Sequence, residues 1–288
     1  MKHARSELEN YEVICRQNAR RIDREIVVPE DTPTEDSSDD EEDLMLYNVR
    51  NFYEERVCVS AEELQNQLLA PQRSPLWHKA REHCITASVF GTANGTNPYQ
   101  SAKDLVREKL WGTFKGNFAT AYGTAHEDDA RFEFEAFAKE NWPGSRVESP
   151  NIYKFVERPW MAVSPDGFLH KPDGTLELIE YKCPLRQTDA HPYSRYEKCI
   201  PPYYHDQIQG IMGHLNDFGF NISVAWFVVW QQHQTWIMKV PFLEDYWDTK
   251  LYPNLHAWYF EQYLPAATHK ANGVLGPNEI EPTFPIEL

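Results

Sequence analysis

The sequence predicts a mixed α/β domain, and three observations support this prediction. Segments in which apolar residues recur every three or four positions alternate along the chain with runs rich in Val, Ile and aromatic residues. Most of the Trp, Phe and Tyr residues lie after Ser74, which marks the start of the main folded part. Two Pro-Asp-Gly turns, beginning at Pro165 and Pro172, separate strand-like stretches and predict strands that fold back on one another.

The expected elements follow from these local patterns. Helical spacing of apolar residues predicts helices at about 75–91, 101–111, 121–140, 202–217 and 243–263. Runs of β-branched and aromatic residues between turn residues predict strands near 151–156, 160–164, 175–183, 221–230 and 235–240. Helices and strands therefore share one domain.

The composition excludes several classes of protein. The chain has 288 residues, 41% of them hydrophobic, which is enough for one large core or two small ones. The longest apolar run, 224–230, is far shorter than the roughly 20 residues of a membrane-spanning helix, and the charged start does not resemble a secretory signal. Five scattered cysteines without a CxxC pair argue against disulfides and against an iron–sulfur cluster. We therefore expect an intracellular protein in a reducing compartment, with no membrane partner.

The negative charge is concentrated in one segment. The net charge of −16 would by itself argue against a nucleic-acid partner. Nine of the acids lie between Glu30 and Asp43 with no base among them, so the remainder of the chain carries only −7. This segment has no apolar residue after Pro29 and is predicted to be a disordered linker. An acidic tail that docks on a partner or screens a DNA site is the alternative.

The linker divides the chain into parts. We expect an N-terminal helical arm at 1–29, the acidic linker at 30–43, a helical extension at 44–73, the main domain at 74–266 and a C-terminal tail at 267–288. Within the extension, Ser60 and Glu63 have the spacing of a capping box, which predicts a helix start.

The strand expected at 175–183 has the strongest chemical signal. Side chains alternate along a strand, so Glu180 and Lys182 share its apolar face. A buried charge is costly unless it is paired or binds a metal. If the turn at Asp166 brings its carboxylate beside Glu180, two carboxylates and a lysine form a site for a hard cation next to a group that can orient water. A buried ion pair beside an ordinary turn is the alternative.

Two predicted helices place a polar side chain on their apolar face. Glu127 precedes the stripe of Ala130, Phe134 and Ala138, where a carboxylate needs a partner; complementing the helix dipole is its simpler explanation. Gln207 heads a similar stripe in the helix at 202–217, and a core amide bonded to the backbone is the alternative there.

The predicted helix at 75–91 has basic and hydroxyl side chains. Lys79, Arg81 and Ser88 lie within three helical turns and would suffice to grip one phosphate group. Taken alone, these residues also fit an ordinary charged amphipathic helix.

These residues belong to five motifs that occur in a fixed order. The motifs are Trp77-His…Arg81…Ile85-Thr-Ala-Ser88, Tyr122-Gly-Thr-Ala-His-Glu127, Ser164-Pro-Asp166-Gly, Glu180-Tyr-Lys182-Cys-Pro and Tyr204-His-Asp-Gln207. Over about 74–266 the set resembles the phage lambda exonuclease and YqaJ-type viral recombinase family, within the PD-(D/E)xK nuclease superfamily. The resemblance implies a nuclease domain with a restriction-endonuclease-like core, in which a central mixed sheet is flanked by helices.

The resemblance also implies roles for individual residues. A divalent metal, Mg²⁺ with Mn²⁺ as a substitute, would be held by Glu127, Asp166 and Glu180, with Lys182 orienting the attacking water. The residues expected to contact the 5′-phosphate or the DNA strand, with Gln207 also counted as catalytic, are Arg81, Ser88, Ser164, Tyr204 and Gln207.

The expected function is a 5′-to-3′ exonuclease acting on ends of linear duplex DNA in viral-type recombination or repair, in the nucleus or cytoplasm of a host cell if the protein is viral. A structure-specific or restriction-like endonuclease on the same core is the first alternative, and a non-catalytic DNA-binding recombination factor is the second. A single-strand annealing protein is a candidate partner. A homo-oligomer is also open, because relatives form a trimer. Local basic residues are expected to recruit DNA: Lys79, Arg81, Lys103, Arg107, Lys109 and Lys115.

Overall fold

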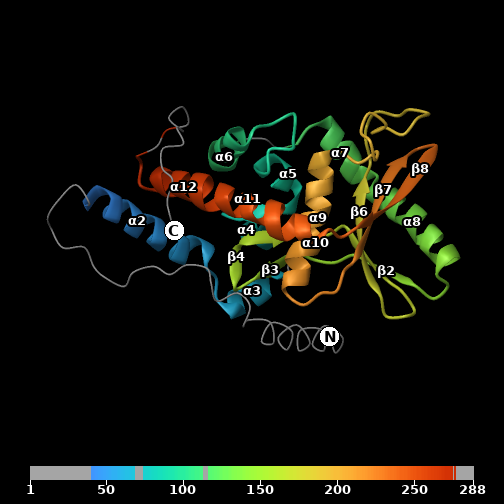
Figure 1. Ribbon diagram of the computed structural model, residues 1–288, viewed down its shortest axis with the longest axis horizontal. Helices are drawn as coiled ribbons and strands as arrows, with labels where there is room; N and C mark the ends of the chain where they lie inside the picture. Colours follow the sequence, from blue (N-terminus) through green and yellow to red (C-terminus); the bar gives the residue numbers. More distant parts are fainter. Residues whose placement is uncertain (1–39, 69–73, 113–115, 275, 277–288) are drawn as a thin grey trace.

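The computed structural model describes residues 40–68, 74–112, 116–274 and 276. The expected N-terminal arm and most of the acidic linker lie outside these residues, as does most of the expected tail. Figure 1 shows two β-sheets with helices packed around them. No helix in the described part of the chain combines the length and apolar character needed to cross a membrane.

The larger sheet has five strands in the spatial order β2-β5-β6-β7-β8. Strands β6 and β7 are parallel and the other neighbours are antiparallel. The strand bounds are β2 Arg146–Glu148, β5 Gly167–His170, β6 Leu176–Lys182, β7 Val224–Gln231 and β8 Gln234–Pro241. The sheet is mixed, as a core of the expected class requires.

The smaller sheet has three strands in the order β1-β4-β3. Strand β4 (Arg158–Val163) pairs in parallel with β1 (Ile85–Thr86) and antiparallel with β3 (Tyr153–Phe155). All of β4 is buried, so this sheet lies inside the domain and not at its edge.

The helices begin at recognisable caps. Ser74, Ser101 and Asn117 each accept a hydrogen bond from the backbone N–H three residues on. The helices before β6 are α2 Asp40–Phe52, α3 Ala61–Leu68, α4 Pro75–Ala80, α5 Phe90–Ala93, α6 Ala102–Trp111, α7 Phe118–Ala125 and α8 Glu127–Asn141. After β6 come α9 Pro202–Asp217 and a C-terminal run of α10 Glu244–Tyr246, α11 Tyr252–Ala257 and α12 Leu264–Ala271, joined by the π-helical segments Trp247–Leu251 and Trp258–Tyr263.

Helices α8 and α9 pack on opposite faces of the larger sheet (Figure 1). Helix α9 buries Ile211 and Leu215 in the main core, together with Leu178 of β6. Helix α8 packs Phe134 against Tyr181 on the other face of that strand. Strand β6 is therefore covered on both sides, and its side chains reach the interior from either face.

Three predicted helices were wrong in extent, and one of them, expected at 243–263, continues as a helical run to Ala271. The helix expected at 75–91 ends at Ala80, because His83 has a left-handed backbone with a φ of 57°, and the chain then enters β1. The helix expected at 121–140 is two helices that meet at His126, whose φ of −109° and ψ of 8° are not helical.

One predicted turn also differs. The turn at Pro172 joins the antiparallel strands β5 and β6, as expected. The segment at Pro165 does not form a hairpin, because β4 before it and β5 after it belong to different sheets. Strands β2 and β5 were not predicted, since both are short.

Other expectations are confirmed. The helices at 102–111 and 202–217 lie where the patterns placed them, and Ser60 accepts from the Glu63 N–H at 3.2 Å. The packed core extends beyond the expected limits of the main domain, since Val49 and Val57 belong to the main core. The limit placed after residue 266 falls inside α12, where Ala267 is buried.

Candidate active site

A cavity of about 740 Å³ lies between α7, the end of β6, the start of α9 and the segment around Arg81. Eight of the nine site residues expected from the sequence line it, although they come from distant parts of the chain. They are Arg81, Ser88, Glu127, Ser164, Asp166, Lys182, Tyr204 and Gln207. Glu180, the ninth, is fully buried behind this wall.

Glu180 is at the centre of the polar network. Its Oε2 accepts hydrogen bonds from Gln207 Nε2 at 2.7 Å and from Lys182 Nζ at 3.3 Å. Its Oε1 is buried and has no hydrogen-bond partner among the described residues. The simpler explanation of Gln207 as an amide bonded to the backbone is therefore wrong, because its amide nitrogen is directed at Glu180.

Asp166 approaches Glu180 because the chain crosses from the smaller sheet to the larger one between Val163 and Gly167. Its Oδ2 accepts from the backbone N–H of Tyr181 at 2.8 Å, which holds it at the end of β6. Burial, followed by the charge of Asp166, raises the pKa of Glu180 to about 8. Two carboxylates close enough to interact in this way disfavour each other's charge unless cations offset it.

Lys182 supplies one such cation. Burial by itself would lower the pKa of Lys182, but the negative charges of Glu180 and Asp166 outweigh burial and raise the pKa, so the amine is held charged. Its Nζ also lies 4.9 Å from the centre of the Tyr204 ring. Tyr204, expected to contact DNA, therefore contacts Lys182 within the protein.

Glu127 is the first residue of α8, half-buried, and lies on the cavity wall. Within the described ranges, no three or more His, Cys, Asp or Glu side chains are grouped as a metal site. The charges of Asp166 and Glu180 interact with each other, and the role of Glu127 as a third ligand stays a prediction.

Arg81 caps the C-terminal end of α4. Its guanidinium lies over the Trp77 ring, 4.2 Å from the ring centre, and burial lowers its pKa to about 10, which leaves it charged at neutral pH. Ser88 and Ser164 line the same cavity. Lys79 does not, because its amine pairs with Glu63 at 3.1 Å.

The other basic residues expected to recruit DNA do not line this cavity. Arg107 pairs with Asp104 at 2.7 Å, and Lys109 lies 5.7 Å from the Tyr263 ring centre. Lys115 lies outside the described residues. Sequence reasoning also missed Tyr193, which lines the cavity from a loop that has no helical or strand periodicity.

The donor set of Asp166 and Glu180 fits a hard divalent cation. Both residues offer carboxylate oxygens, and the buried Oε1 of Glu180 has no partner among the described residues. Mg²⁺ is usually bound by one or two protein carboxylates together with substrate phosphates, so a pair is sufficient. Mn²⁺ accepts the same oxygen ligands.

The fold is that of the lambda-exonuclease-like PD-(D/E)xK nucleases. The alkaline exonuclease LHK-Exo from Laribacter hongkongensis is similar with a TM-score of 0.54 and 22% identity, and the match covers 69% of this chain and 97% of that one. LHK-Exo in complex with dAMP is similar with a TM-score of 0.55 and 20% identity over the same shares. No curated protein sequence matches the chain.

The sequence itself also matches a family model. Residues 76–214 match the model of the YqaJ-like viral recombinase domain, so this part of the chain is similar to that family. The resemblance inferred from the five motifs and the expected fold class are both confirmed.

Proposed function

We propose that the chain is a metal-dependent exonuclease that degrades linear duplex DNA in the 5′-to-3′ direction during viral-type recombination or repair. The match to the YqaJ-like viral recombinase domain and the fold shared with an alkaline exonuclease support a nuclease. The observation that carries the proposal is the network in which buried Glu180, beside Asp166, accepts hydrogen bonds from both Lys182 and Gln207 at the wall of one cavity.

Asp166 and Glu180 are the residues proposed to hold Mg²⁺, with Glu127 as the third expected ligand. A bound Mg²⁺ would lower the pKa of a water molecule and stabilise negative charge on the scissile phosphate. Lys182 is held in its charged form next to both carboxylates, where it can orient a water molecule and offset negative charge. Gln207 fixes the orientation of the Glu180 carboxylate through its 2.7 Å hydrogen bond.

The proposed direction depends on the opposite side of the cavity. Arg81 is fixed against Trp77, and a guanidinium can bind a phosphate through two parallel hydrogen bonds. Ser88 and Ser164 add hydroxyl donors on the same wall. With a terminal 5′-phosphate bound there, the first phosphodiester of the strand would lie on the side of the cavity that holds the carboxylates. A deoxynucleoside monophosphate is the product class expected, and LHK-Exo has been solved with dAMP.

Digestion of a linear duplex labelled at one end tests the proposal. The substrate is prepared with and without a 5′-phosphate and incubated in Mg²⁺ or in EDTA. We expect cleavage in Mg²⁺ and none in EDTA. Mononucleotides should be released from the 5′-ended strand, and phosphorylated ends should be degraded faster than hydroxyl ends.

Two results would contradict this function. Efficient cutting of closed circular DNA would favour the endonuclease, and DNA binding without hydrolysis in Mg²⁺ or Mn²⁺ would favour the non-catalytic factor. A single-strand annealing partner and a homo-oligomer remain proposals, for which co-purification and sedimentation of the full chain are the tests.

A further inference from the structure

A second set of exposed groups lies outside the cavity. Tyr99 is 69% exposed, although large aromatic side chains are normally much more buried. Arg195 is also exposed, and Tyr196 beside it is half-buried. We call Tyr99, Arg195 and Tyr196 the tyrosine–arginine patch. It joins the loop before α6 to the loop between β6 and α9, which are far apart in sequence.

The guanidinium of this patch is held in one orientation. Arg195 Nη2 donates to the hydroxyl of Tyr99 and, at 3.1 Å, to that of Tyr196. The guanidinium carbon lies 5.0 Å from the Tyr196 ring centre. Both hydrogen bonds use the same nitrogen, and no described residue accepts from the other donors of Arg195. An arginine has five N–H donors, so the patch presents donors in a fixed plane beside an exposed aromatic ring.

The patch is continuous with the cavity through ring contacts. The ring centres of Tyr99 and Tyr203 are 6.1 Å apart, and those of Tyr203 and Tyr204 are 4.5 Å apart. Tyr204 lines the cavity and faces Lys182. An extended polymer with one end in the cavity would therefore meet the patch on leaving it along this side.

We propose that the tyrosine–arginine patch binds an unpaired DNA strand next to the cavity, with a base stacked on Tyr99 and a phosphate bound by Arg195. Aromatic rings accept any base by stacking, and a charged guanidinium matches the backbone phosphate. Unpaired bases are required because the faces of bases within a duplex are already stacked. The inference rests on the proposed function, since it assigns the patch to the same substrate and adds single-strand recognition to it.

The same contacts would also arise if the patch only fastened the two loops together. The two explanations require different parts of the Tyr99 side chain. Stacking needs the ring and not the hydroxyl, so Tyr99→Phe should retain DNA binding while Tyr99→Ala loses it. Fastening needs the hydroxyl that accepts from Arg195, so both variants should then behave alike.

The experiment measures binding of labelled DNA to the full chain in EDTA, which separates binding from hydrolysis. The DNAs are a blunt duplex and the same duplex with an unpaired tail of about 12 nucleotides, of either polarity, at one end. We expect Tyr99→Ala to weaken binding of a tailed duplex by about tenfold and to leave the blunt duplex nearly unchanged. Arg195→Gln should reduce the slope of log affinity against log salt by about 0.7 for tailed DNA.

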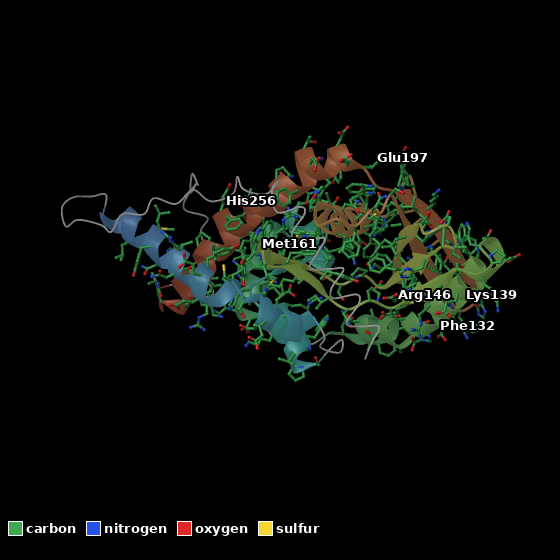
Figure 2. All side chains as sticks on the ribbon, turned by 90° about the horizontal axis from the view of Figure 1, so that it is seen from below. Phe132, Lys139, Arg146, Met161, Glu197 and His256 are labelled. Atoms are coloured by element: carbon green, nitrogen blue, oxygen red, sulfur yellow. The ribbon has the colours of Figure 1, made fainter. Side chains whose placement is uncertain are left out.

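Matched controls come from two exposed residues on other elements, α8 and β2. Phe132 is 71% exposed on α8 and Arg146 is exposed on β2. Figure 2 shows Glu197, which belongs to the same loop as Arg195, at the top of the view, and Phe132 and Arg146 below it toward the right end. Phe132→Ala and Arg146→Gln should leave the effect of the tail unchanged.

The outcomes separate this inference from the proposed function. Equal losses on blunt and tailed DNA, or equal losses for Tyr99→Phe and Tyr99→Ala, would overturn single-strand binding by the patch. Digestion by the wild-type chain in Mg²⁺ is measured in parallel. If the wild-type chain does not digest DNA while Tyr99→Ala still loses binding to tailed DNA only, the nuclease proposal fails. The patch is then retained as a single-strand binding site.

Discussion

The hydroxyl of Tyr259 donates a hydrogen bond to the backbone carbonyl oxygen of His83, 2.6 Å away, and so connects the C-terminal helical run to the turn after Arg81. His83 has a φ of 57°, a left-handed conformation that costs a residue other than glycine about 1 kcal/mol. This turn ends α4 and returns the chain to β1, so that Arg81 and Ser88 reach the same cavity. Tyr259 therefore supports the position of Arg81 without touching the cavity.

We expect Tyr259→Phe to weaken the recognition of 5′-phosphorylated ends. Loss of one hydrogen bond of about 1 kcal/mol corresponds to roughly a fivefold rise in KM for phosphorylated duplex, with kcat little changed. Adding His83→Gly should restore the KM, because glycine adopts a left-handed backbone without strain.

A second tyrosine of the same helical run provides the control for this prediction. Tyr246 donates to Asp206 at 2.6 Å, so Tyr246→Phe also loses a hydrogen bond but should keep the preference for phosphate. If His83→Gly failed to rescue Tyr259→Phe, or if Tyr246→Phe raised KM equally, Tyr259 would have only a general structural role.

The carboxylate network predicts a separation between activity and stability. Asp166→Asn, Glu180→Gln and Lys182→Met should each lower cleavage by at least about a hundredfold while the protein remains folded, as judged by circular dichroism and melting. Glu177 lies on the opposite face of the same strand, where it pairs with Lys171 at 2.7 Å. Glu177→Gln should lower the melting temperature and preserve the rate of the folded fraction. If Glu180→Gln lowered only the melting temperature and Glu177→Gln lowered only the rate, Glu180 would not be a residue of the active site.

Arg81 predicts the preference for one type of DNA end. Arg81→Ala should reduce the ratio of rates on 5′-phosphorylated and 5′-hydroxyl ends by roughly tenfold or more, because a charge-assisted contact contributes about 1.5–3 kcal/mol. Arg81→Lys should restore the ratio only in part, since an ammonium lacks the planar fork. Lys79→Ala is the control, because its amine is directed at Glu63 outside the cavity. Equal end ratios in the wild type and in Arg81→Ala would refute phosphate recognition by this residue.

His214 predicts how stability depends on pH. Burial, together with the nearby charge of Arg158, holds the pKa of His214 well below 6.5 in the folded state. Below pH 6.5 the unfolded chain therefore binds a proton at this histidine, whereas the folded chain does not. The free energy of unfolding is full above pH 6.5 and falls as the pH drops below that value. The expected slope approaches about 1.4 kcal/mol per pH unit.

Urea unfolding between pH 5 and 7 measures this slope. His214→Gln should flatten it, whereas His233→Gln, at an exposed position, should leave it unchanged. A slope that survived in His214→Gln would assign the pH dependence to other groups.

Two N-terminal deletions of different length should have different effects on activity and stability. Removing residues 1–39 should leave digestion of naked DNA within about tenfold of the wild type, which corresponds to roughly 1.4 kcal/mol in barrier height. Removing residues 1–57 should destabilise the chain, because Val49 and Val57 are buried in the main core. Melting curves and digestion assays of both forms check the prediction. Inactivity of the shorter deletion with normal melting would assign a catalytic role to the segment before Asp40.

The sequence predicted the regular elements best where strong local signals occur. Ser101 caps α6, and Pro202 begins α9, so both helices lie where the patterns placed them. The break at His126 and the left-handed turn at His83 were missed, because each is stabilised by distant residues. Tyr259 lies 176 positions from His83, and no local pattern includes that contact.

The site shows the same division between local and distant information. Alternation along β6 was enough to place Glu180 and Lys182 on one face, and the motif order was enough to add Arg81 and Gln207. Sequence could not predict that Gln207 would donate to Glu180, or that the Tyr204 ring would lie against Lys182, because these contacts depend on how α9 packs.

The contact between Tyr259 and His83 also constrains the moment at which the site can exist during synthesis. Arg81 and Ser88 emerge from the ribosome long before the C-terminal helical run that supports their turn. Until that run is translated and packed, long-range pairings such as β1 with β4 have to form without it. A nascent chain therefore carries the carboxylates of the site before the turn that positions Arg81 is fully supported, and the complete cavity forms only after the C-terminal helical run has been made.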